Sequence, residues 1–250
     1  MTQKAFTQGF TVIEVLITGF ILVVVLGIVS TFLVQQMQLN RTTQARNEVQ
    51  DKVRQVAEVV AQDLHMAGAS RYVDEDGDSS AGVILASCNF EEVKCLKGVD
   101  GGPLDTLEIA YITSLRDDAD LSCRNVSYVV ADGVLLRSDR RCDPLDPTPS
   151  DRTHDHQPFA DNILAFDIQY VCSNAATVDY YPDSSDCPKG TGVTYPRTAR
   201  FTVVGESNVR APVQGEEEYV TVSGQTVTCG PERVCFAQSR EVLMPNLKDQ

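Results

Sequence analysis

The sequence predicts an α+β protein in which one long N-terminal helix packs on an antiparallel β-sheet. Two observations predict it: an apolar stretch that continues into an amphipathic helical face, and a polar remainder made of short strand-like runs between turn residues. At 250 residues the chain is long enough for such a helix and one globular domain. We therefore divide it into a short polar segment (1–9), an apolar helical segment (10–34), an amphipathic helical segment (35–68) and a globular, cysteine-containing remainder (69–250).

The apolar stretch is long enough to cross a membrane. No charged residue occurs from Val15 to Asn40, and the 20 residues from Val15 to Val34 are mainly aliphatic and aromatic. As a helix they span about 30 Å, the thickness of the hydrocarbon core, and a helix satisfies its own backbone hydrogen bonds there. The run is too long for a cleaved secretory signal, and Ser30-Thr31-Phe32-Leu33 is a poor cleavage site for one.

The helical pattern continues beyond this stretch. Apolar residues recur at spacings of three and four, which places them on one helical face, while charged residues occupy the other faces. The face consists of Val49, Val53, Val56, Val60, Leu64 and Ala67. We expect a helix from near Phe10 to Met66 that stops at Gly68 and whose second half docks on the sheet.

A carboxylate lies at the start of the apolar helix. Glu14 follows the short polar segment Met1 to Gly9, and placing its charge in lipid costs roughly 2.5–3.5 kcal/mol. Cleavage after Gly9 would create an α-amine on Phe10 at the same depth. Glu14 of one subunit could pair with that amine in a neighbour, which would compensate both charges.

The segment from Gly9 to Glu14, followed by an apolar helix, resembles the cleavage and assembly motif of type IV prepilins and type II secretion pseudopilins. The resemblance implies a type IV pilin-like fold and a leader peptide of residues 1–9, removed by a prepilin peptidase after Gly9. It also implies methylation of Phe10 and an assembly contact through Glu14. Many major pilins have a proline in this helix, whereas the first proline here is Pro103.

Strand-like runs fill the globular part: Val83–Ala86, Leu107–Ile112, Val126–Ala131, Val134–Arg137, Ile163–Val171, Ala199–Val204, Tyr219–Val222 and Val234–Leu243. Asp132-Gly133 between two of these runs is a hairpin signal. Leu164, Phe166, Ile168 and Tyr170 alternate and predict one buried face.

Several segments resemble the PilW family of minor pilins in order and spacing. They are 63–68, with His65 where that family usually has arginine, then 107–111, 128–137, 162–170, 200–204 and 240–246. The resemblance implies a minor pilin that initiates or caps a type IV pilus.

Eight cysteines, all between Cys88 and Cys235, indicate disulfides in an oxidising compartment. They allow many connectivities, of which sequential pairing is the simplest. That scheme joins Cys88 to Cys95, Cys123 to Cys142, Cys172 to Cys187, and Cys229 to Cys235.

Other candidate sites are weaker. The net charge of −14 disfavours direct nucleic-acid binding, and Arg137, Arg140 and Arg141 suggest a solvated turn. Asp74, Asp76 and Asp78 resemble half of a calcium loop, but Ser79 and Leu85 stand where an EF-hand has glycine and glutamate, so a solvated acidic loop is the simpler interpretation. The His154-Asp155-His156 run with Asp151 lies in a proline-rich loop and lacks a pocket.

No cofactor is expected beyond this candidate calcium ion, and motifs for a hydrolase elbow or a phosphate loop are absent from the sequence, so we expect no enzyme.

The expected protein is a minor pilin that starts as a single-pass inner-membrane protein with an extracytoplasmic C-terminal domain and then enters a pilus at the cell surface. Its expected partners are major and minor pilins, the prepilin peptidase and the inner-membrane assembly platform, with indirect roles in adhesion, twitching motility or DNA uptake. Two alternatives stay open: a J-type pseudopilin of a type II secretion system, and a pilus-tip adhesin.

Overall fold

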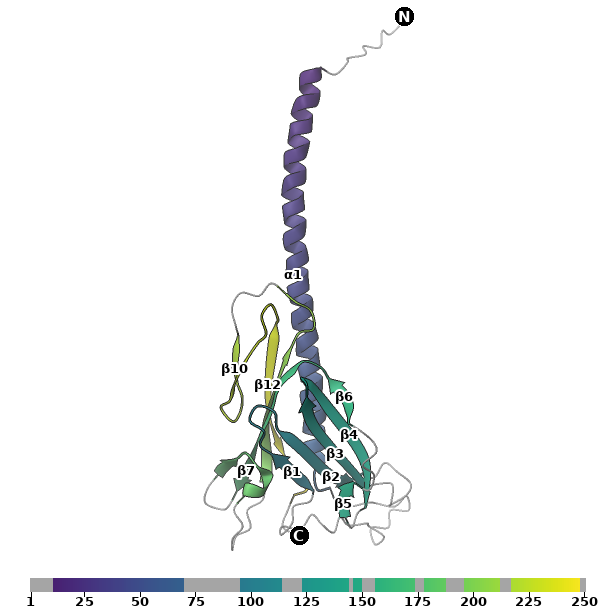
Figure 1. The fold of residues 1–250 in the computed structure, drawn as a ribbon, viewed down its shortest axis with the longest axis vertical. Coiled ribbons are helices and arrows are strands. Elements are labelled where there is room, and N and C mark those ends of the chain that lie inside the picture. Colours follow the sequence, from purple (N-terminus) through teal and green to yellow (C-terminus); the bar gives the residue numbers. More distant parts are fainter. Residues whose placement is uncertain are drawn as a thin grey trace, which may run out of the picture.

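The computed structural model describes residues 11–69, 95–113, 123–143, 146–149, 156–173, 178–187, 196–211 and 217–247. One helix, α1 (Val12–Met66), leads into a domain of antiparallel strands that packs around the C-terminal half of that helix (Figure 1). The fold class predicted from the sequence, a long helix on antiparallel β structure, is confirmed.

Helix α1 ends as the sequence predicts. Its last residue is Met66, and Gly68 adopts a φ of +74°, in the left-handed region that favours glycine. A Cβ at Gly68 would lie 2.6 Å from Cδ2 of Leu247, so the C-terminal segment packs directly on the helix end. The Gly68 amide donates to the Ala110 carbonyl at 3.0 Å, which fixes the chain where it leaves the helix.

The strands form two main sheets rather than the single sheet expected. The first has the order β1-β2-β3-β4-β5, with β6 also paired to β4; the second has the order β12-β9-β7-β8. The first sheet contains β1 (Leu96–Val99), β2 (Thr106–Ile112), β3 (Cys123–Ala131), β4 (Val134–Asp143), β5 (Asp146–Pro149) and β6 (Gln157–Ala160). The second contains β7 (Ile163–Ser173), β8 (Val178–Tyr181), β9 (Pro196–Glu206) and β12 (Cys235–Leu243).

Two further elements lie outside these sheets among the described residues. Strands β10 (Glu218–Val220) and β11 (Thr226–Thr228) form a separate antiparallel pair. A short 3₁₀ helix, η2 (Ser184–Asp186), lies against β1, where the Gly98 amide donates to Ser184 Oγ at 2.9 Å. The hydroxyl thus accepts from an edge strand whose amide would otherwise lack a partner.

The two sheets are joined by the turn between β1 and β2. Leu104 forms a parallel bridge with Phe166 of β7, and the Asp105 amide donates to the Phe166 carbonyl at 2.8 Å. The Asp105 carboxylate accepts from the amides of Ile168 at 2.7 Å and Gly101 at 2.8 Å. Because this carboxylate is buried, desolvation raises its pKa to about 7, although both amides favour its charged form.

The predicted hairpin is present between β3 and β4. Asp132 and Gly133 have φ values of 51° and 75°, the pattern of a type I′ turn, and Ala131 pairs with Val134 across it. Phe166, Ile168 and Tyr170, which the sequence predicts to line one buried face of β7, are buried, but Ala165 and Asp167 on the other face are buried too. The prediction is wrong for Leu164, which is half-buried. A register shift between Ile163 and Ala165 exchanges the faces at that point.

Candidate functional site

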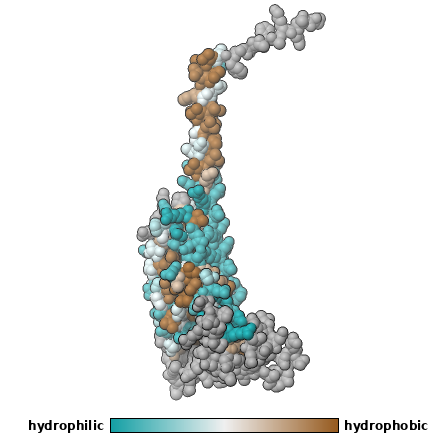
Figure 2. All heavy atoms as spheres, turned by 45° about the vertical axis from the view of Figure 1, so that its right-hand side comes forward, coloured by the Kyte–Doolittle hydropathy of each residue, from teal (hydrophilic) through white to brown (hydrophobic). Residues whose placement is uncertain are grey.

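The N-terminal half of α1 projects from the domain with its apolar surface uncovered. The charge-free part of the helix has an 18-residue window of mean hydropathy 2.9, and no residue of that window is buried. Figure 2 shows this half as a mainly hydrophobic rod whose base is surrounded by hydrophilic residues. Docking on the domain begins at Ala45, the first buried residue of the helix, ten positions after the start of the predicted amphipathic segment. By length and composition the rod is a candidate membrane span.

Glu14 lies at the tip of this rod in a capping box. The Thr11 amide and the Thr11 hydroxyl both lie 3.0 Å from Glu14 Oε2, and the Glu14 amide donates to Thr11 Oγ1 at 3.4 Å. The box satisfies amides at the helix start and fixes the orientation of the carboxylate. Gly9 and Phe10, the predicted cleavage and methylation positions, lie outside the described residues.

The domain is held to the second half of the helix by the predicted apolar face. All six residues of that face are at most 2% exposed: Val49, Val53, Val56, Val60, Leu64 and Ala67. They belong to the core that includes side chains of both sheets, such as Ile109 and Phe201. Burying this face removes apolar surface from water, which is the main term that stabilises the docked helix.

A buried polar cluster reinforces the docking. Asp63, 7% exposed, accepts hydrogen bonds from the hydroxyl of Tyr128 and from Arg137, whose Nη2 lies 3.1 Å away. Burial, and next the Asp63 carboxylate, raise the pKa of Tyr128, so this hydroxyl keeps its proton and remains a donor. The sequence places Asp63 in one segment and Tyr128 and Arg137 in another, and predicts no contact between them; the structure brings all three together.

This cluster corrects the interpretation of the three arginines as a solvated turn. All three lie on β4, within Val134–Asp143. Arg137 is half-buried in the Asp63 cluster, and Arg140 is partly buried on the other side of the strand. Only Arg141 is exposed.

Disulfides close loops at both sheets. The structure joins Cys123 to Cys142, Cys172 to Cys187, and Cys229 to Cys235, which are sequential pairs. Cys95 is also disulfide-bonded, and its predicted partner Cys88 lies outside the described residues. The calcium candidates Asp74, Asp76 and Asp78, together with His154, lie outside them too. Within the part of the chain that the structure describes, no group of three or more acidic, His or Cys residues is placed to hold a metal ion.

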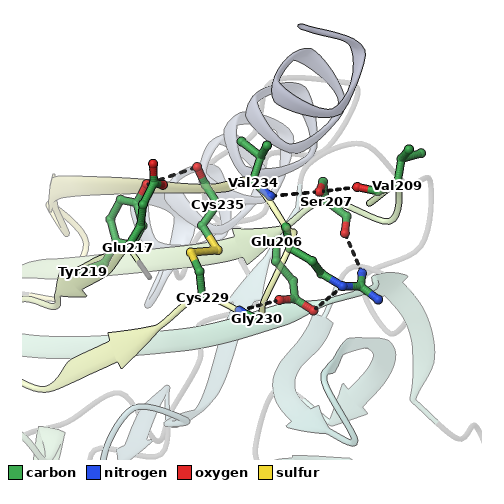
Figure 3. The surroundings of a disulfide bond; sticks show 10 residues. Glu206, Ser207, Val209, Glu217, Tyr219, Cys229, Gly230, Val234 and Cys235 are labelled. Atoms are coloured by element: carbon green, nitrogen blue, oxygen red, sulfur yellow. Dashed lines mark hydrogen bonds and ion pairs between the residues drawn. A yellow bond between two sulfur atoms is a disulfide. The ribbon is translucent and has the colours of Figure 1, made fainter. Parts of the chain in front are cut away.

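The loop between Cys229 and Cys235 is also fixed by hydrogen bonds (Figure 3). The Glu206 carboxylate accepts from the Gly230 amide at 3.3 Å and lies 3.6 Å from Nε of Arg233. The Tyr219 hydroxyl donates to the Cys235 carbonyl at 3.1 Å, which ties the β10–β11 pair to the start of β12. The start of β12 is therefore cross-linked to the loop that precedes it and tied to the β10–β11 pair.

A curated relative decides the family. The pilin-like protein PilA3 of Thermus thermophilus is 42% identical to this chain over 244 residues, which cover 96% of this chain and 97% of the relative. The chain belongs to the type IV pilin-like proteins. A solved structure, the type IV-like pilin TTHA1219 from Thermus thermophilus, covers 79% of this chain and 97% of its own length at 15% identity and a TM-score of 0.48. No family model matches the chain.

Membership of this family indicates what kind of protein the chain is. A type IV pilin-like protein is a structural protein and not an enzyme. The uncovered N-terminal half of α1 carries Glu14, and the disulfide-linked domain packs on the other half, where Asp63 pairs with Arg137.

Proposed function

We propose that this chain is a minor pilin that helps to initiate or cap a type IV pilus. It is made as a precursor, cleaved after Gly9 and methylated at Phe10. It then packs laterally with other pilins through the N-terminal half of α1.

The uncovered apolar rod is the observation that carries this proposal. Its side chains are exposed along the whole hydrophobic window, although water disfavours such a surface, so the rod requires either lipid or other helices around it. A filament of parallel helices supplies the second environment, and the inner membrane supplies the first before assembly. One rigid helix serves in both settings because its backbone hydrogen bonds are internal.

Glu14 gives the packing a defined register. Both Thr11 donors lie on Oε2, so the cap leaves Oε1 for a contact with a neighbouring subunit. A free α-amine on Phe10 of that neighbour would compensate the carboxylate. Losing either charge leaves the other unpaired in an apolar environment, which costs several kcal/mol.

The proposed partners follow from the steps of cleavage, membrane insertion and filament assembly. They are the prepilin peptidase, the inner-membrane assembly platform, and major and minor pilins; the name of the PilA3 relative supports the pilin partners. The proposed location is the inner membrane, with the domain outside the cytoplasm, and afterwards the pilus at the cell surface. Three disulfides among the described residues support an oxidising location for the domain. The contact of Asp63 with Tyr128 and Arg137 links two segments that resemble the PilW family and supports that assignment.

Replacing Glu14 by glutamine tests the proposal. The variant keeps the size of the side chain and an acceptor for Thr11, but it lacks the charge that pairs with the amine. We expect normal cleavage, membrane insertion, and a roughly tenfold or greater loss of the protein from sheared filaments, because the neighbour's amine is left uncompensated.

Glu58→Gln is the matched control, since Glu58 lies on the docked half of the same helix and is half exposed beside Arg240. This control should enter filaments normally. Normal incorporation of Glu14→Gln would contradict the pairing. Loss of protein secretion with intact pili, after deletion of the whole chain, would favour the type II pseudopilin over the pilus.

A further inference from the structure

The face of the first sheet that points away from α1 contains a pocket of about 340 Å³. Its lining comes from β1, β2, β3 and β4 and from His156. Lys97 pairs with Glu108, Glu108 with Ser127, and Asn125 with Arg140, so these side chains share one face of the sheet. The size is in the range of small-molecule pockets.

The pocket floor is a preorganised polar surface. Asn125 Nδ2 donates to Glu108 Oε1 at 2.9 Å, and His156 Nε2 lies 3.1 Å from Ser127 Oγ. Asn125 is only 2% exposed. Polar groups fixed in this way can present hydrogen-bonding atoms to a ligand at little cost in side-chain entropy.

Arg140 gives the pocket an unsatisfied cationic group. Its Nε is buried and has no hydrogen-bond partner among the described residues. A buried N–H without an acceptor is costly, and a guanidinium is suited to bind a carboxylate or another anionic oxygen. Nε itself is closed off from the pocket, so an anionic oxygen there would bind the guanidinium through its other N–H groups.

The local charge contrasts with that of the whole molecule. The chain carries 35 acidic and 21 basic residues, yet the pocket is lined by the two cations Lys97 and Arg140 against the single carboxylate of Glu108. Glu108 is engaged by the Asn125 amide. The pocket is therefore an anion-attracting site on an anionic protein.

We propose that this pocket binds an acidic saccharide unit, such as a uronic acid residue of a surface polysaccharide. The carboxylate of the sugar would contact Arg140 and Lys97, while its hydroxyls would contact Glu108 and Ser127. Val99 and Val129, which also line the pocket, provide an apolar surface for the C–H face of the ring. This function goes beyond filament assembly and does not depend on which filament contains the chain.

The test uses the full-length protein in detergent micelles with digalacturonate as the probe, measured by calorimetry. We expect saturable binding that is at least about tenfold tighter than binding of neutral digalactose, because the charged contact to Arg140 is absent with the neutral sugar. Inorganic phosphate at the same concentration should not displace digalacturonate. Displacement by phosphate would show a site for simple anions and overturn the saccharide assignment.

Arg140→Gln should weaken digalacturonate binding about tenfold or more. Arg141→Gln is the matched control: it removes the same charge one residue away, at an exposed position on the opposite face of β4, and should bind as the unmodified protein does. Equal weakening by both variants, or by neither, would overturn the proposal. If Arg140→Gln does not fold, Lys97→Gln replaces it, since Lys97 is exposed at the rim and its loss should weaken binding about threefold.

Discussion

Replacing Asp63 by asparagine tests how α1 is fixed to the sheets. In the structure Asp63 accepts from the Tyr128 hydroxyl and pairs with Arg137, whose Nη2 lies 3.1 Å from the carboxylate. Asparagine keeps the shape and an acceptor for Tyr128, but it removes the charge that Arg137 faces. The perturbation therefore isolates the ionic part of the contact.

The expected cost follows from the burial of the pair. Breaking a fully buried ion pair costs about 3–5 kcal/mol. The Arg137 side chain is 23% exposed and keeps a second contact with Asp139 at 3.6 Å, so part of its charge remains compensated. We therefore expect a loss of about 2 kcal/mol, which lowers Tm by roughly 4–8 °C for a domain of this size.

The assay is urea and thermal unfolding of the full-length protein in micelles, with Glu58→Gln as the control. The Glu58–Arg240 pair joins the same helix to β12, but its side chains are 53% and 32% exposed, so its loss should cost less than about 1 kcal/mol. If Asp63→Asn destabilised the domain no more than Glu58→Gln did, the reasoning that the buried cluster holds the helix would be refuted.

Three further changes test the domain. Because the pKa of Asp105 is raised in the folded chain, between about pH 4 and pH 7 the folded chain holds a proton that the unfolded chain has lost. The free energy of unfolding should therefore fall with rising pH, by up to about 1.4 kcal/mol per pH unit from this group. Asp105→Asn should flatten that slope, measured by urea unfolding at about pH 5 and about pH 7. Gly98→Ala should destabilise the domain by about 1–3 kcal/mol, because the new Cβ would overlap the hydroxyl of the buried Tyr170. Thermal unfolding measures this loss, and an unchanged Tm would refute the close approach. Replacing Cys123 and Cys142 together by serine should lower the free energy of unfolding by about 3 kcal/mol, measured by urea unfolding. An unchanged midpoint would show that this disulfide contributes nothing to stability.

The sequence predicts the helix and its docked face well because both depend on local periodicity. The six apolar residues of that face, from Val49 to Ala67, recur at helical spacing, and every one of them is buried. The Asp132-Gly133 turn is likewise local, since the two residues themselves favour the positive φ values observed. Sequential cysteine pairing coincides with three bonds in the structure because each pair closes a short loop.

Features that depend on long-range contact were not predictable in this way. The connection between the two sheets depends on the Leu104 bridge to Phe166, and the face change at Leu164 depends on a register shift against β9. Strands such as β1 and β6 are four residues long, too short for a periodic signal.

The candidate site residues differ in the same way: some can be identified from local sequence, whereas others depend on long-range contacts. Glu14 stands out in the sequence because a single carboxylate interrupts an apolar run. Asp63 does not stand out, since an acidic residue near a helix end is ordinary. Its partners Tyr128 and Arg137 lie more than sixty positions away and become adjacent only through the β3–β4 pairing, in which the two face each other. The alternation of that hairpin, which places both on the core face, is the one sequence signal that could have grouped them.

The most direct test of the central claim is the intact mass and N-terminal sequence of the protein recovered from membranes and from sheared filaments. The account predicts a mature chain that begins at methylated Phe10 in both fractions, which places a free amine within reach of a neighbouring Glu14. A chain that still carries Met1 to Gly9 in wild-type cells would contradict it, because no such amine would then exist within the apolar layer.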